Sequence, residues 1–87
     1  MPNLSETAKS LLTLLNNIDE LIIKSSNRED AIDVMKAFRV YAKNKNFNLP
    51  QDKINNFFQV IYDAKPYTLN YIIKDIAADI VQLDQKY

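Results

Sequence analysis

Apolar residues recur at steps of three and four along most of the chain, a spacing that places side chains on one face of an α-helix. The first such run consists of Leu4, Ala8, Leu11, Leu15, Ile18 and Ile22. Similar runs follow, and no segment shows the alternation that is typical of a β-strand. The pattern therefore predicts four amphipathic helices, at about 4–25, 27–44, 50–64 and 67–85.

Local signals predict where the later helices begin. Ser26 is followed three residues later by Glu29, which is typical of a capping box at the start of a helix near residue 27. Pro50 suits the first position of the third helix, because the N–H group that proline lacks has no intrahelical partner there. Pro66 cannot continue the third helix and marks the start of the fourth.

Four amphipathic helices with short polar connections are most simply packed as an antiparallel up-down-up-down four-helix bundle. A chain of 87 residues suits one all-α domain over 1–87, and we expect a monomer. In the connection between the second and third helices, Phe47 and Leu49 are expected to fold back onto the end of the bundle. The residues expected in the core are Leu11, Leu15, Ile18, Phe38, Phe57, Ile61, Ile73, Ile76 and Ile80.

The composition argues against catalysis. The chain has no Gly, no Cys and no His, so it lacks the usual residues of phosphate-binding loops, thiolate chemistry and neutral-pH acid–base catalysis. The acidic pairs Asp75 with Asp79 and Glu29 with Asp33 are expected to be solvated acids or partners of a helix dipole. We therefore expect no enzyme, no metal and no cofactor. The lack of Cys and of an apolar signal segment favours the cytoplasm, where a peripheral position at the inner face of the membrane is compatible with the sequence.

A basic cluster is the first candidate binding surface. It comprises Lys36, Arg39, Lys43, Lys45 and Lys53. The cluster suits either a recognition patch or a solvated helix end, where cations compensate the helix dipole. Nucleic acid is not the expected partner, because eleven basic and eleven acidic side chains leave the chain without net charge.

The five tyrosines are the second candidate, since tyrosine is enriched in protein interfaces. Tyr41 and Tyr62 lie near apolar stripes and are expected in the core. Tyr67, Tyr71 and Tyr87 fall outside the stripes, so that partner contact and simple half-burial both remain open for them.

The segment 33–62 resembles the class IIa bacteriocin immunity proteins, especially those like the enterocin A immunity protein. The resemblance lies in Asp33 and Val34, in Phe38 and Tyr41 along the same helix, in "KNKNFNL" at its end, and in Ile54, Asn55 and Tyr62. Members of this family are small cytosolic four-helix bundles, which agrees with the fold expected from periodicity.

The resemblance implies that the chain protects a bacteriocin-producing lactic acid bacterium from its own pore-forming peptide without catalysing a reaction. Members are thought to engage the mannose-type sugar-phosphotransferase permease from the cytosolic side when bacteriocin occupies it. Their C-terminal half carries much of the discrimination between bacteriocins. Many members continue into a further C-terminal tail, whereas this sequence ends at Tyr87, so we expect specificity in the third helix, the "DAKPYT" connection and the fourth helix.

These expectations give a candidate set of partner-binding residues and one alternative function. The set is Lys43, Lys45, Lys65, Tyr67, Asn70, Tyr71, Lys74 and Tyr87. The alternative is a small helical regulator or antitoxin-like adaptor that binds a soluble protein or DNA.

Overall fold

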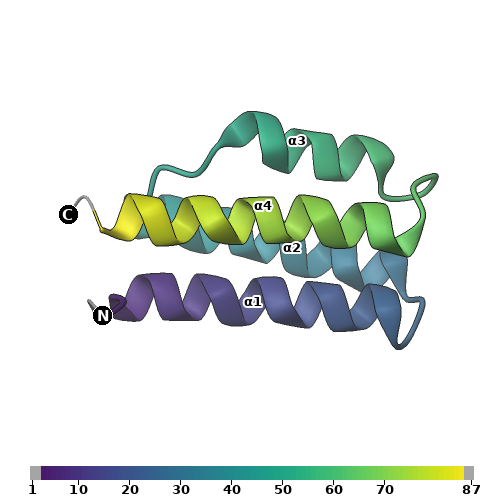
Figure 1. Cartoon of the computed structure of the whole chain (residues 1–87), viewed down its shortest axis with the longest axis horizontal. Coiled ribbons are helices and arrows are strands. Elements are labelled where there is room, and N and C mark those ends of the chain that lie inside the picture. Colours follow the sequence, from purple (N-terminus) through teal and green to yellow (C-terminus); the bar gives the residue numbers. More distant parts are fainter. Residues whose placement is uncertain (1–2, 86–87) are drawn as a thin grey trace.

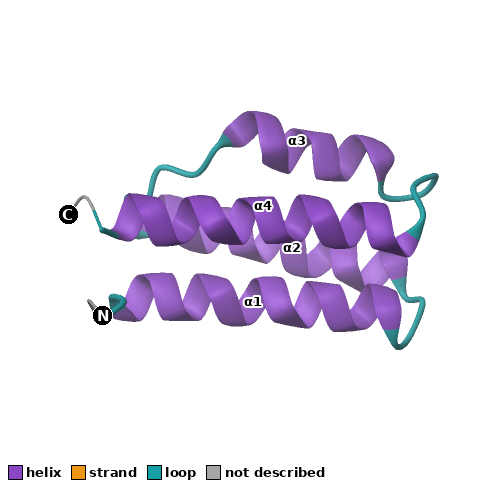
Figure 2. Cartoon of the chain, viewed as in Figure 1, coloured by secondary structure: helices purple, strands orange, loops and turns teal. Residues whose placement is uncertain are grey.

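The computed structural model describes residues 3–85 and contains four helices in that range: α1 (Glu6–Ile23), α2 (Arg28–Asn44), α3 (Gln51–Val60) and α4 (Pro66–Asp84). Successive helices run in opposite directions, so α1 begins and α4 ends at the same end of the bundle (Figure 1). No strand occurs within residues 3–85 (Figure 2). The predicted antiparallel four-helix bundle is confirmed.

The buried apolar side chains form one cluster between the helices. α1 packs along both α2 and α4, while α3 packs mainly against α4. All nine residues that the apolar pattern places in the core are buried, and so are Phe47 and Leu49 of the connection between α2 and α3. The periodicity of the sequence thus identifies the inner face of every helix.

The start of α2 differs from the predicted capping box. Asn27 caps the helix, and its Oδ1 accepts a hydrogen bond from the backbone N–H of Asp30 at 3.0 Å. Ser26 lies one position too early for this role and adopts a left-handed φ of 50° in the turn after α1. The prediction of Ser26 as the cap is therefore wrong by one residue, because asparagine is an equally good capping residue.

The end of α2 is a Schellman turn, in which a left-handed residue reverses the chain after the helix. Asn46 has a φ of 56°, and its N–H donates to the carbonyl oxygen of Lys43 at 3.1 Å. The N–H of Phe47 donates to the carbonyl oxygen of Ala42 at 2.9 Å. This pair of bonds directs Phe47 back toward the bundle, which explains its burial.

α3 is shorter than predicted at both ends. Pro50 is the residue before the helix rather than its first residue, and the last helical residue is Val60 rather than residue 64. Beyond Val60, the guanidinium of Arg28 donates to the carbonyl oxygen of Ile61 and, at 2.8 Å, to that of Ala64. Arg28 thereby pairs with backbone carbonyl groups beyond the end of α3. These bonds join the start of α2 to the connection between α3 and α4.

Candidate functional site

The outer face of α4 carries two exposed aromatic side chains. Tyr67 and Tyr71 keep 62% and 72% of their surface exposed, and Lys74 is exposed as well. They follow one another at steps of four and three, so they lie along one stripe of the helix, while Leu69 and Ile73 face the core. We call Tyr67, Tyr71 and Lys74 the tyrosine face. The sequence places Tyr67 and Tyr71 outside the apolar stripe and leaves half-burial open, whereas the structure shows both side chains exposed.

The other predicted partner-binding residues of α4 differ in their surroundings. Lys65 is exposed and occupies the capping position directly before Pro66. Asn70 is half-buried, and its Nδ2 donates to Asp19 Oδ1 at 2.7 Å. The expectation that Asn70 is a free surface residue is therefore wrong, since its amide joins α4 to α1. Tyr87 lies outside the described residues.

Two polar contacts hold α4 against α1, and the sequence did not single out either of them. Besides the bond from Asn70 to Asp19, the hydroxyl of Ser5 donates to Asp84 Oδ1 at 2.5 Å. The two contacts lie near opposite ends of the helix pair, and both are consistent with a single antiparallel register. They fix how α4 lies on the bundle and thus where the tyrosine face points.

Exposed apolar side chains gather at one end of the bundle. Of the five large apolar residues that are exposed in the described chain, four lie close to where α1 and α3 end and α4 begins: Ile23, Tyr62, Tyr67 and Tyr71. The expectation that Tyr62 is a core residue is wrong, because Tyr62 lies beyond the last residue of α3 and is 62% exposed. Tyr41 is only partly buried, against the core cluster.

Tyr62 contacts the start of α2 through its hydroxyl group, which donates to Glu29 Oε1 at 3.4 Å. Partial desolvation, together with the negative charge of Glu29, raises the pKa of Tyr62 above its ordinary value. A neutral tyrosine hydroxyl at this end of the bundle remains a hydrogen-bond donor in neutral solution.

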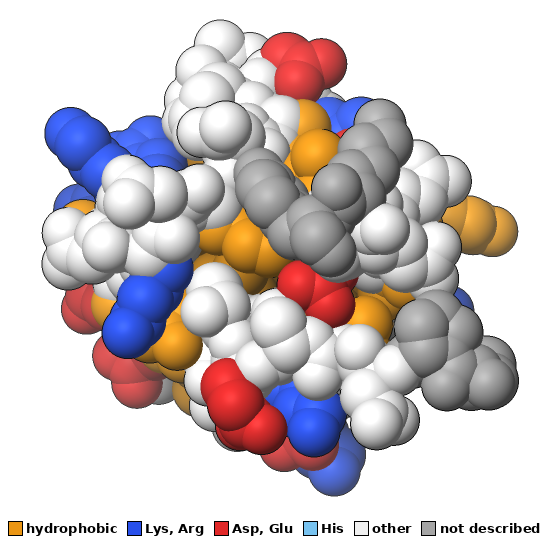
Figure 3. All heavy atoms as spheres, turned by 90° about the vertical axis from the view of Figure 1, so that its left-hand side faces the viewer, with side chains coloured by type: hydrophobic (Ala, Val, Ile, Leu, Met, Phe, Trp, Pro, Cys, Tyr) orange, Lys and Arg blue, Asp and Glu red, His pale blue; other side chains and the backbone are white. Residues whose placement is uncertain are grey.

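The residues of the predicted basic cluster have different surroundings. Lys45 lies over the ring of Tyr41, with Nζ 5.9 Å from the ring centroid. Lys43 and Arg39 line a hollow between α2 and the start of α3. Figure 3 views the end of the bundle at which α1 begins and α4 ends, where basic and acidic side chains are interspersed and apolar atoms show between them. This end has no uniform charge of one sign.

Lys53 does not belong to the basic cluster. Its Nζ lies 2.6 Å from Asp79 Oδ2 and 3.2 Å from Asp75 Oδ1, so that it joins α3 to α4. The hydrogen bond to Asp79 raises the pKa of Lys53 above its ordinary value. The expectation of solvated acids at these positions is wrong for Asp79, whose side chain keeps 23% of its surface exposed and has a cationic partner.

Three structural features are absent from residues 3–85. Within residues 3–85, no group of three or more acidic side chains is placed to hold a metal ion, and no side-chain polar atom is buried without a partner. In the same range, none of the helices combines the length and the apolar character of a membrane span. Comparison with protein-family models, with curated proteins and with solved structures gives no match.

Proposed function

We propose that the chain is a bacteriocin immunity protein of the class IIa type, which binds its partners without catalysing a reaction. In this proposal it acts from the cytosol on the mannose-type sugar-phosphotransferase permease while bacteriocin occupies it. The sequence support is the resemblance over residues 33–62. The structural support is an α-helical bundle that presents a separate exposed face on α4.

The exposure of Tyr67 and Tyr71 is the observation that carries the proposal. Each aromatic ring offers a large apolar surface and a polar hydroxyl group, and such side chains often anchor protein interfaces. Two such side chains exposed one helical turn apart provide adjacent contact area that a partner could cover. The tyrosine face also belongs to the C-terminal half, where the family has its discrimination between bacteriocins.

The surrounding residues suit a membrane-embedded receptor met from the cytosol. Lys65 and Lys74 lie beside the tyrosines, and neither forms a salt bridge with any residue of the described chain. Their charges are free to pair with acidic groups of a partner, which favours correct orientation on encounter. Ile23 adds an exposed apolar side chain at the same end of the bundle.

Expression in a bacteriocin-sensitive lactic acid bacterium tests the proposal. The strain would carry the chain or an empty vector and would be exposed to a panel of class IIa bacteriocins. We expect the chain to raise the inhibitory dose of one of them or of a few. In detergent extracts of the same cells, the permease should be retained with the chain only when that bacteriocin has been added. Unchanged sensitivity to every bacteriocin would contradict the proposal and favour the soluble-adaptor alternative.

A further inference from the structure

A ridge of unpaired cations runs along α2. Lys36, Arg39 and Lys43 follow one another at steps of three and four, so they share one side of the helix. None of the three forms a salt bridge with residues 3–85. Only Lys43 lies in the last turn, where a cation compensates the helix dipole. Compensation of the helix dipole therefore does not explain the positive charges at Lys36 and Arg39.

Arg39 is held in place by an aromatic ring rather than by a carboxylate. Its guanidinium carbon lies 4.9 Å from the centroid of Phe58 on α3. A cation this close to the face of an aromatic ring is attracted to it, while its N–H groups stay available to other acceptors. Those groups donate no hydrogen bond to an acceptor in the part of the chain that the structure describes. Arg39 is thus a donor without an acceptor in the described chain, and its guanidinium group suits a bidentate acceptor such as a carboxylate.

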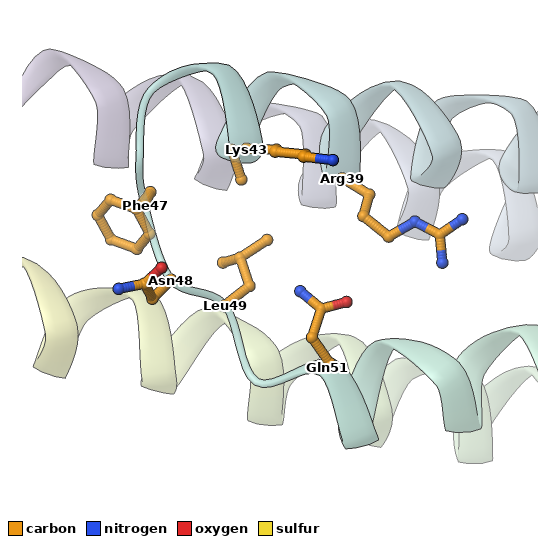
Figure 4. Close-up of a pocket in the computed structure, with 7 residues that line it drawn as sticks. Arg39, Lys43, Phe47, Asn48, Leu49 and Gln51 are labelled. Carbon is orange, nitrogen blue, oxygen red and sulfur yellow. The ribbon is translucent and has the colours of Figure 1, made fainter.

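A hollow of about 440 Å³ lies beside this donor. Arg39, Ala42 and Lys43 line it from α2, and Gln51 lines it from the first residue of α3. In Figure 4 the side chains of Leu49 and Gln51 both point toward α2, that of Leu49 from the connection and that of Gln51 from the start of α3. We call the surface formed by Arg39, Lys43, Leu49 and Gln51 the cationic groove. It combines two cations, an apolar wall and an amide.

We propose that the cationic groove binds an acidic peptide segment of a partner protein. A carboxylate of the segment pairs with Arg39 and a second one with Lys43. A neighbouring aliphatic side chain packs against Leu49, and the amide group of Gln51 bonds to the peptide backbone. Each chemical feature of the groove then has a complement, and the binding energy comes from charge-assisted hydrogen bonds together with a modest apolar contact.

A short acidic peptide fits the charges better than a nucleic acid does. The cations of the ridge are bounded by carboxylates, with Asp33 before Lys36 on α2 and Asp52 next to Gln51 on α3. A continuous polyanion that follows the ridge would meet these acids, whereas a segment with two or three carboxylates would not. The chain as a whole also carries no net charge, and nucleic-acid-binding domains are usually basic.

The groove is separate from the tyrosine face. None of its residues comes from α4, so changes in the groove leave the tyrosine face intact. A bundle with both surfaces has the means to hold two partners at once.

Binding of a labelled peptide to the full chain tests the proposal. The probe is a short fluorescent peptide that contains Glu, Asp and Leu, and its control has Gln and Asn in place of the acids. Fluorescence anisotropy should show binding of the acidic probe, with an affinity that falls as salt is raised. In ¹⁵N NMR spectra, the side-chain amide signals of Asn48 and Gln51 should shift. Equal binding of the neutral peptide, or shifts centred on other residues, would overturn the proposal.

Charge-matched variants locate the contact. Arg39→Gln with Lys43→Gln should weaken binding by about tenfold or more, since two charge-assisted contacts are lost. Lys9→Gln with Lys24→Gln removes the same charge at α1, where both lysines are already paired with acidic neighbours, and should leave the affinity unchanged. Arg39→Lys keeps a cation beside Phe58 but removes the planar donor pair, and it should cause an intermediate loss. Equal losses in the two double variants, or tighter binding of a single-stranded oligonucleotide at the same residues, would overturn the proposal.

Discussion

Ser5 and Asp84 join the start of α1 to the end of α4 through two hydrogen bonds to one carboxylate. The hydroxyl of Ser5 donates to Asp84 Oδ1 at 2.5 Å, and its backbone N–H donates to Oδ2 at 2.9 Å. The hydroxyl oxygen also accepts from the N–H of Ala8 at 3.1 Å and so caps α1. The carboxylate of Asp84 thus lies at the positive end of the α1 dipole, where a negative charge is favoured.

The Ser5 contacts predict an acid-sensitive contribution to stability. The hydrogen bonds from Ser5 lower the pKa of Asp84 below its ordinary value of 3.8. Because the folded pKa is lower than the unfolded one, the contribution is complete above pH 3.8 and is lost as the pH falls through the folded pKa. Asp84→Asn should therefore lower the melting temperature at neutral pH, and the difference from wild type should shrink in acid.

Thermal melts over a pH series measure this difference. Asp63→Asn is a suitable control, because Asp63 is exposed and its side chain forms no hydrogen bond within residues 3–85. A gap between Asp84→Asn and wild type that stays constant from neutral pH to strong acid would show that the bonds from Ser5 do not stabilise the fold.

Substitution by glycine at Ser26 should stabilise the bundle. A left-handed φ costs a residue with a Cβ atom about 1 kcal/mol, and Ser26 has a φ of 50°. Ser26→Gly removes this cost, offset in part by the greater freedom of glycine in the unfolded chain. We expect a gain of up to about 1 kcal/mol in the free energy of unfolding. The neighbouring Ser25→Gly should bring no gain, since Ser25 has no positive φ. Urea denaturation of both variants measures the effect, and an equal response would contradict it.

Two aromatic residues near the end of α3 should respond differently to truncation. Phe57 is fully buried, so Phe57→Ala should cost about 3 to 5 kcal/mol, much of the stability of a domain of this size. Tyr62→Ala should have a much smaller effect, because that side chain is mostly exposed. Chemical denaturation followed by circular dichroism distinguishes the two. A loss at Tyr62 as large as that at Phe57 would mean that Tyr62 packs in the core.

The apolar pattern was sufficient to predict the helices and their inner faces, because burial of one stripe per helix dominates the stability of a small bundle. It failed at Tyr62 for a physical reason. The helical spacing that places Tyr62 near Phe58 no longer applies once α3 ends at Val60. Arg28, a residue from another helix, donates to the carbonyl oxygens of Ile61 and Ala64 just beyond this end, and no local signal in the sequence reports that contact.

The polar contacts between helices could not be predicted from the sequence either. The bond between Asn70 and Asp19 depends on the axial register of α4 against α1, and periodicity fixes only which side of each helix faces inward. In the same way, Lys53 pairs with Asp79 because α4 lies on that side of α3. The exposure of Tyr67 and Tyr71 was open to prediction, since it follows from the stripe of α4 alone.

We propose that the tyrosine face carries protection while the rest of the bundle supplies the fold. A variant with Tyr67→Ser, Tyr71→Ser and Lys74→Gln tests it, with Asn70 left in place to preserve the contact to Asp19. Val40→Ser with Lys9→Gln serves as the control, because it removes an exposed apolar side chain and one positive charge from other helices. Exposed substitutions of this kind usually change stability by within about 0.5 kcal/mol each.

The decisive measurement is the bacteriocin dose that halves the growth of a sensitive strain, taken at equal protein levels for each variant. We expect the control to protect like the wild type, whereas the variant of the tyrosine face should leave the strain as sensitive as the empty vector. Full protection by that variant, with unchanged helicity and melting temperature, would contradict the account.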